Sequence, residues 1–247
     1  MKSTKEKPSQ LILFVDDALA HGVKQAYYPE VLDSVNSSNV KIVGLSASIG
    51  FQHEYLITPK ENEMFIFNPY SSNYLSLDDD IEMKYLQSKF YCFQRLFCIF
   101  GALKFEGEVS KIEEKEVELD INGNISSKLV SLSVGAQFTK KETLNQTLKI
   151  SRSFEEKTIK NLNEIKKYVQ ENSLGSELFI HNLLKECEYQ NGLKGVQEVS
   201  SHFSNDLNST LDIGLKLGCC GLFDLSSNVR YKLKQRKEIN YSMKITF

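Results

Sequence analysis

The chain has 247 residues, of which 41% are hydrophobic and 25% are charged, and its formal net charge at pH 7 is −2. This is the composition of a globular protein with a sizeable core, and the length suits a single domain over 1–247. Nucleic acid is disfavoured as a partner, because phosphate backbones are bound mainly by Lys and Arg, and the chain has no basic excess.

The sequence shows no signal for export or for membrane insertion. No stretch approaches the roughly 18 consecutive apolar residues of a transmembrane helix. The apolar run 11–15 is too short for a signal peptide and is followed directly by Asp16 and Asp17. The five cysteines have no regular spacing of the kind that indicates a disulfide framework. We therefore expect a cytoplasmic protein.

The N-terminal part alternates strands with turns. A short buried strand is expected over 11–15, followed by a helix or turn-rich segment to about Leu32. Residues 41–51 alternate apolar and small polar side chains, which predicts a half-buried strand. Two further strands are expected over 54–58 and 63–67, because turn residues separate them.

The clearest helix is predicted over 78–100. Ser76 and Asp79 have capping-box spacing, and Gly101 lies where a C-terminal capping glycine is expected. Apolar residues recur at spacings of three and four along the helix. A helix this apolar should be buried on most sides and should lie across a sheet.

A β-meander is expected next. Residues 103–109 and 117–121 alternate, and Asn122-Gly123 is a strong hairpin turn signal. The partner strand is 127–138, and a last strand runs back over about 143–154. The alternation within 127–138 is strict, with these residues on one face: Val130, Leu132, Val134, Ala136 and Phe138.

The segment 155–204 is expected to be a helical insert. Its periodicity predicts one helix before the turn at 173–176, a second over about 177–189, and a short third over 193–203. Three strands should then close the chain, over 210–219, 228–235 and 238–247.

The predicted fold class is therefore α+β. Two antiparallel β-meander blocks, about 41–154 and 209–247, are expected to form one sheet system. The buried helix 78–100 and the helical insert 155–204 accompany it.

Chemical motifs are sparse. A hydrophobic strand that ends in paired aspartates, such as Asp16 and Asp17, is how receiver domains and several Mg²⁺-dependent enzymes present carboxylates to a metal. The simpler interpretation is that one of the two caps the following helix. His53 is a third weak catalytic candidate, although on a strand it would point away from Glu54. No cofactor or metal motif is present, and we expect neither group.

The adjacent cysteines Cys219 and Cys220 are the most unusual local feature. On a strand their side chains would face opposite ways, so Cys219 would face the core and Cys220 would be exposed. Cys220 is therefore a candidate for acylation or redox chemistry. The simpler interpretation is that cysteine serves as a small apolar residue where a strand ends, as Cys92 and Cys98 do in the buried helix.

The favoured functional hypothesis is a non-catalytic protein-interaction module. Its partner would be another protein, or a second copy that pairs with an exposed edge strand at 238–247. The Lys-rich, Asn-rich and tryptophan-free composition suggests a bacterial source, and small proteins of this kind often belong to toxin, immunity or phage-defence systems.

A first alternative is a membrane-active, pore-forming effector. The alternating strands approach the length that a tilted strand needs to cross a bilayer, and their second faces are polar. Such a design is similar to that of gasdermin-type and cholesterol-dependent pore formers, without a match of residues, and it implies membrane contact only after activation. Ordinary half-buried antiparallel sheet explains the same alternation more simply. A second alternative is a metal-dependent enzyme that uses Asp16 and Asp17, with His53 nearby.

Overall fold

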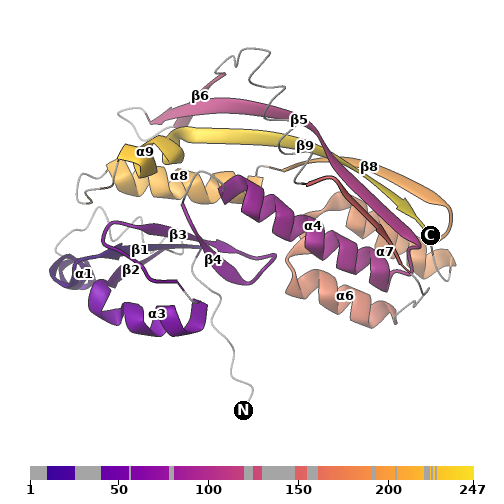
Figure 1. Cartoon of the computed structure of the whole chain (residues 1–247), viewed down its shortest axis with the longest axis horizontal. Helices are drawn as coiled ribbons and strands as arrows, with labels where there is room; N and C mark the ends of the chain where they lie inside the picture. Colours follow the sequence, from indigo (N-terminus) through magenta and orange to yellow (C-terminus); the bar gives the residue numbers. More distant parts are fainter. Residues whose placement is uncertain are drawn as a thin grey trace.

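A computed structural model of the chain confirms the expected α+β fold (Figure 1). It contains two sheets, whereas the sequence led us to expect one sheet system. The structure describes residues 10–25, 40–55, 57–77, 81–119, 125–129, 148–154, 161–190, 193–203, 205–219, 223, 225 and 227–247.

Sheet A is formed by the N-terminal part of the chain. Its spatial order is β2-β1-β3-β4, with β1 (Leu11–Val15), β2 (Val40–Gly44), β3 (Met64–Asn68) and β4 (Asn73–Ser76). Helix α1 (Asp17–Lys24) follows β1, and β2 then lies parallel to β1. We did not expect this parallel pair; a helix between two strands can bring the chain back so that both strands point the same way. The other two pairings in the sheet are antiparallel.

The strands expected over 41–51 and 54–58 are largely wrong. Only β2 is extended, and the chain then forms a 3₁₀ turn η1 (Leu45–Ala47) and helix α3 (Ser48–Tyr55). Phe51 and Tyr55 lie one helical turn apart, and both rings pack on the face of sheet A that carries Phe14, with 5.1 Å between the centroids of Phe14 and Phe51. Contacts of the aromatic rings with the sheet thus favour the helix over continued alternation.

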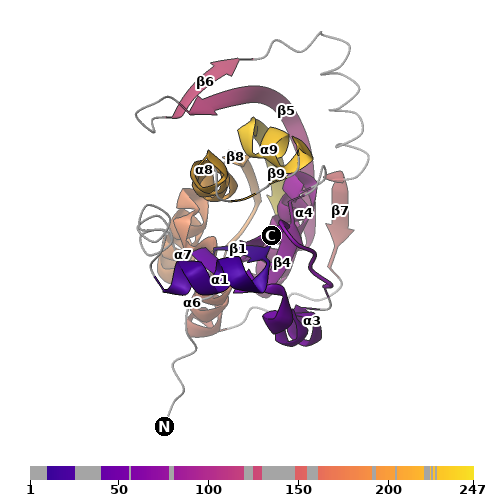
Figure 2. The same cartoon turned by 90° about the vertical axis from the view of Figure 1, so that its left-hand side faces the viewer.

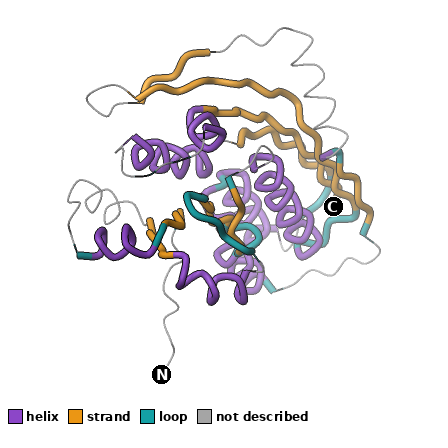
Figure 3. The backbone as a smooth tube through the Cα atoms, turned by 60° about the vertical axis from the view of Figure 1, so that its left-hand side comes forward, coloured by secondary structure: helices purple, strands orange, loops and turns teal. Residues whose placement is uncertain are grey.

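Sheet B is formed by antiparallel strands between Lys104 and Thr246. Its order is β6-β5-β9-β8, and β7 also pairs with β5. The strands are β5 (Lys104–Leu119), β6 (Ile125–Leu129), β7 (Ile150–Ser153), β8 (Val196–Phe203) and β9 (Gln235–Thr246). The two strands expected over 103–109 and 117–121 form one continuous β5, with a bulge between Val109 and Lys111. Figure 3 shows how the long strands curve over the helices. Residues 130–138, which we expected to form a strand, lie outside the described residues.

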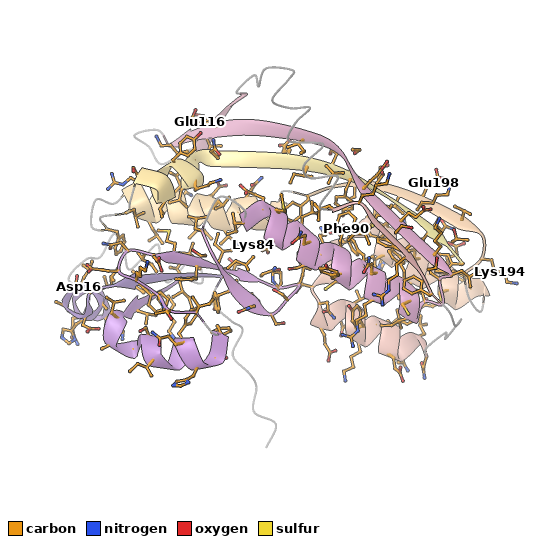
Figure 4. The ribbon with its side chains drawn as sticks, in the orientation of Figure 1. Asp16, Lys84, Phe90, Glu116, Lys194 and Glu198 are labelled. Carbon is orange, nitrogen blue, oxygen red and sulfur yellow. The ribbon has the colours of Figure 1, made fainter. Side chains whose placement is uncertain are left out.

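The predicted buried helix is confirmed as α4 (Ile81–Ile99), which lies across sheet B. Phe90, labelled in Figure 4, points from α4 toward the sheet and packs on Phe105 and Tyr241. The helix ends near Gly101, whose φ of 83° is one that glycine adopts readily.

The helical insert is confirmed for its first two helices. They are α6 (Leu162–Glu171) and α7 (Leu178–Gln190), joined through a 3₁₀ turn η2 (Leu174–Ser176). The third helix, expected over 193–203, is wrong, because 196–203 forms β8 and pairs with β9 in an unbroken register.

Two expected strands are instead helices. Residues 210–219 belong to α8 (Asn205–Cys219), and 228–235 fall almost entirely in α9 (Ser227–Lys234). Both helices lie beneath the long strands of sheet B, and α8 separates that sheet from sheet A (Figures 1 and 2). The order of layers is therefore sheet B, α8 with α9, sheet A and α3. The strand over 238–247 is confirmed as the main part of β9.

Candidate functional site

The two aspartates lie at the carboxyl end of β1, where Figure 4 labels Asp16. Asp16 is the N-cap of α1, since its Oδ1 accepts a hydrogen bond from the backbone N–H of Leu19 at 2.9 Å. The helix-capping interpretation is therefore confirmed. Asp17 Oδ1 accepts hydrogen bonds from the backbone N–H of Ser46 at 3.1 Å and from Ser46 Oγ at 2.8 Å. Asp16 thus caps α1, and Asp17 holds α1 to the turn η1 that follows β2.

Gly44 makes the approach of Asp17 to β2 sterically feasible. A Cβ atom placed on Gly44 would lie 2.2 Å from Asp17 Oδ1, which is far inside van der Waals contact. The bonds from Asp17 to Ser46 therefore require glycine at the end of β2. Gly44 and Asp17 thus both have a structural role in the unit formed by β1, α1 and β2.

His53 belongs to a different element from the aspartates. It lies on α3, where its side chain is exposed, rather than on the strand that we expected. Within the described part of the chain, no group of three or more His, Cys, Asp or Glu side chains is placed to hold a metal ion. The structure thus joins Asp17 to Ser46 and leaves His53 on the helix surface.

The described cysteines include two thiols of raised pKa. Cys92 is buried on α4, its Sγ donates to the carbonyl oxygen of Tyr70, and burial raises the pKa of its thiol. Burial also raises the pKa of the Cys187 thiol. Cys219 is the last residue of α8, so the strand geometry expected for it is wrong. Cys220 lies outside the described residues.

The proposed edge strand is not an edge. β9 lies between β5 and β8 and pairs with both along most of its length. Residues 239–246 therefore have a paired strand on both sides, and the expectation of a free edge there is wrong.

A shallow groove of about 420 Å³ lies on the outer face of sheet B. Its charged side chains include Glu106, Glu198 and Lys244, each of which forms an ion pair. Lys244 of β9 lies 3.0 Å from Glu198 of β8, and Lys104 lies 2.9 Å from Glu106 within β5. The hydrogen bond from Lys104 lowers the pKa of Glu106. These charges are already paired, and they make the outer face of the sheet strongly polar.

A buried cation lies on the opposite face of sheet B. The ammonium group of Lys89 forms an ion pair with Glu177, and the Lys89 side chain is only 4% exposed. Four aromatic rings surround Nζ at 5.5 to 5.9 Å from their centroids, those of Tyr70, Phe93, Phe203 and Tyr241. Burial raises the pKa of Tyr241, and the negative charge of Glu177 raises it further. The pair joins α4 to the start of α7.

Helix α8 is held by contacts on two sides. A Cβ atom on Gly214 would lie 2.7 Å from Leu233 of α9, 3.4 Å from Leu11 and 3.6 Å from Met64 of sheet A. On Gly218 it would lie 2.9 Å from Leu225. The two glycines thus allow α8 to lie close to α9 and to sheet A, and any side chain at either position would crowd these contacts.

Helix α9 presents an unusual surface for a helix of eight residues. Tyr231 is 56% exposed, whereas Lys232 is buried at 7%. Arg230 and Lys234 are exposed. The sequence from 230 to 237 holds five basic residues and no acidic one. The end of α9 and the start of β9 are therefore strongly basic in sequence.

Comparison of the chain with family models, with curated proteins and with solved structures finds no match. In the described part of the chain, no helix is both long and apolar enough to cross a membrane.

Proposed function

We propose that this is a membrane-active protein that permeabilises lipid bilayers, and that α8 and α9 are the segment that rearranges. One observation carries the proposal: the sequence from 207 to 235 has the apolar alternation of a β-hairpin, yet 207–219 and 227–234 fold as helices. The two helices continue directly from β8 and into β9, which are already paired as a hairpin. Conversion of helix to strand would lengthen that hairpin.

The helical state of this segment depends on its surroundings. Gly214 and Gly218 lie inside α8, and each glycine costs about 1 kcal/mol relative to alanine in a helix. Tyr231 exposes an aromatic ring to water in α9. Contacts with Leu11, Met64 and Leu233 offset these costs. Loss of the neighbouring sheet A would therefore remove much of what keeps the segment helical.

The dimensions of the segment suit a bilayer. Arms 207–219 and 223–235 exceed the about 9–11 residues that a tilted strand needs to cross the hydrocarbon core. The basic run 230–237 would attract anionic headgroups, since each Lys or Arg near such a surface contributes about 1 kcal/mol. Both features favour a lipid surface as the target.

Dye release from vesicles tests the proposal. The full chain is added to vesicles of phosphatidylglycerol and phosphatidylcholine, before and after limited proteolysis and mild acidification. We expect release in at least one condition, with less from vesicles of phosphatidylcholine alone. Intact vesicles in every condition would refute the proposal.

Two matched lysine variants of α8 sharpen this test. Ile213 and Asn208 are both half-buried in the helix, but only Ile213 belongs to the apolar face of the expected hairpin. A lysine in the middle of a lipid-facing strand costs about 2–4 kcal/mol. We expect Ile213→Lys to abolish dye release and Asn208→Lys to retain it, with circular dichroism confirming that both variants fold. Equal release by the two variants would contradict the hairpin assignment.

The interaction-module and metal-dependent enzyme hypotheses stay predictions. The first loses the free edge expected for self-association at 238–247, and the second has carboxylates that already serve as a helix cap and as a link from α1 to η1. No contact described above favours either of them over the membrane hypothesis.

A further inference from the structure

We propose that the α8–α9 segment converts in the register that β8 and β9 already have, and that its odd-numbered residues then contact lipid while its even-numbered residues face water. This inference rests on the proposed function and specifies the geometry of the same segment. Its evidence is the pairing of β8 with β9, the distribution of charge along 205–237, and the polarity of sheet B.

The register is fixed up to the start of the helices. β8 and β9 pair one to one from Val196 with Thr246 to Phe203 with Ile239, without a bulge. Each further step would pair the next residue of α8 with the preceding residue of the β9 side. Continued in this way, the register pairs Leu211 with Tyr231 and Leu217 with Leu225, so apolar residues meet at both of these positions.

Charge supports the same register. Continued pairing brings Asp206 opposite Arg236 and Asp212 opposite Arg230, and these are the only positions where two charged residues face each other. Both pairs have opposite signs, which stabilises an antiparallel ladder, whereas like charges in those places would destabilise it. A shift of the register by one residue would instead place apolar residues opposite charged ones.

The two faces of the lengthened hairpin differ sharply. All six charged residues between 207 and 235 have even numbers: Asp212, Lys216, Asp224, Arg230, Lys232 and Lys234. The odd positions carry no charge and are mostly apolar: Leu207, Leu211, Ile213, Leu215, Leu217, Cys219, Phe223, Leu225, Val229, Tyr231 and Leu233. Such a division is the pattern of strands with one lipid-facing and one water-facing side.

The faces are continuous with those of sheet B. Odd-numbered Phe203, Ile239 and Tyr241 point into the core, whereas even-numbered Glu198 and Lys244 lie on the polar outer face. The lengthened strands would therefore keep the apolar and polar faces of β8 and β9, and no bulge would be needed to bring the faces into line.

A single hairpin would leave unpaired backbone groups along both outer sides. Unpaired N–H and C=O groups are not tolerated in hydrocarbon, so hairpins from several copies of the chain must join side by side. The rate of dye release is then expected to rise more steeply than the first power of protein concentration.

Site-specific labelling tests the assignment of the two faces. In a variant with all five cysteines replaced by serine, single cysteines at 211, 212, 213, 215 and 216 carry an environment-sensitive fluorophore. On vesicles that release dye, we expect labels at 211, 213 and 215 to be quenched at least twofold more by a lipid-borne quencher than labels at 212 and 216. Iodide in the water phase should give the reverse order.

The outcomes separate this inference from the proposed function. Dye release with a quenching period of about 3.6 residues, or with every label exposed to water, would overturn the hairpin assignment while permeabilisation stands. Absence of dye release would overturn both.

A charge exchange tests the register without the fluorophore. Asp212→Arg and Arg230→Asp each place like charges opposite each other, and we expect each to slow dye release about tenfold. The double variant restores the pairing with the charges exchanged, and we expect near wild-type rates. Release by the double variant that is as slow as that of the single variants would overturn the register.

Discussion

At the residue scale, the ion pair between Lys89 and Glu177 is the least predictable feature of the molecule. Both residues lie in or beside helices that the sequence predicts, but the pair joins positions 88 residues apart in the chain. The periodicity of either helix alone favours a solvated position for each charge. Burial of the pair follows only from the way α4 and α7 meet over sheet B, which local patterns do not encode.

Removal of one partner should be costly. Glu177→Gln leaves Lys89 buried among aromatic rings without a countercharge, and breaking such a pair typically destabilises by about 3–5 kcal/mol. We expect urea unfolding to show a loss of this size. The double variant Lys89→Met with Glu177→Leu should recover much of it, because apolar residues often replace buried ion pairs at little cost. A loss below about 1 kcal/mol for Glu177→Gln would show that water reaches the pair.

The surface pair between Lys166 and Glu188 should behave differently. A hydrogen bond of 2.6 Å from Lys166 lowers the pKa of Glu188 and joins α6 to α7. Because the folded pKa lies below the unfolded one, the pair stabilises the protein above the ordinary glutamate pKa, and this contribution is lost as pH falls through the folded value. Lys166→Met should therefore lower the melting temperature slightly at neutral pH and not at strongly acidic pH. An equal decrease at both pH values would point to lost packing instead.

At the element scale, α8 shows why part of the fold could not be read from the sequence. Leu207, Leu211 and Leu215 are four residues apart, and this spacing fits a helical stripe as well as one face of a strand. The buried side of the helix also includes Thr210 and Gly214, which strand alternation would place on the polar side. Tertiary contacts decide between the two periods. In α4, by contrast, apolar spacings of both three and four left only the helix, and that prediction is confirmed.

The candidate site, like the fold, could be predicted only in part from the sequence. Paired aspartates after a strand correctly indicated a helix cap at Asp16, whereas the alternation of 210–219 and 228–235 predicted strands where the structure has α8 and α9. The helical state of the two segments and the contact of α8 with sheet A were not predictable. They depend on Leu11 and Met64, which lie far from α8 in the sequence.

Two glycines allow the packing of α8 to be tested. Gly214→Ala would improve helix propensity but would place a methyl group 2.7 Å from Leu233. Gly50→Ala in α3 has the same effect on propensity and meets nothing within 4 Å. We expect Gly50→Ala to stabilise by about 0.5–1 kcal/mol and Gly214→Ala to destabilise by about 1–3 kcal/mol, measured by urea unfolding. If both variants were stabilised equally, α8 would not be closely packed.

At the scale of the whole molecule, sheet A packs against the segment that we propose to rearrange, on the side away from sheet B. Residues of α8 lie between the two sheets, and one hydrophobic cluster includes Leu11 of sheet A, Leu211 of α8 and Tyr241 of sheet B. A lengthened hairpin therefore requires that α8 first separate from sheet A. The N-terminal strands act in this scheme as a restraint on the C-terminal ones.

Adjacent residues of β1 provide a matched test of that restraint. Leu11 and Ile12 are both buried, but Leu11 faces α8, whereas Ile12 belongs to the cluster between sheet A and α3. Substitution of either by alanine should cost about 2–5 kcal/mol of stability. We expect only Leu11→Ala to accelerate dye release from anionic vesicles, because it alone weakens the contact that holds α8. If Ile12→Ala accelerated release equally at a similar loss of stability, general destabilisation would control activation, and sheet A would have no specific role as a restraint.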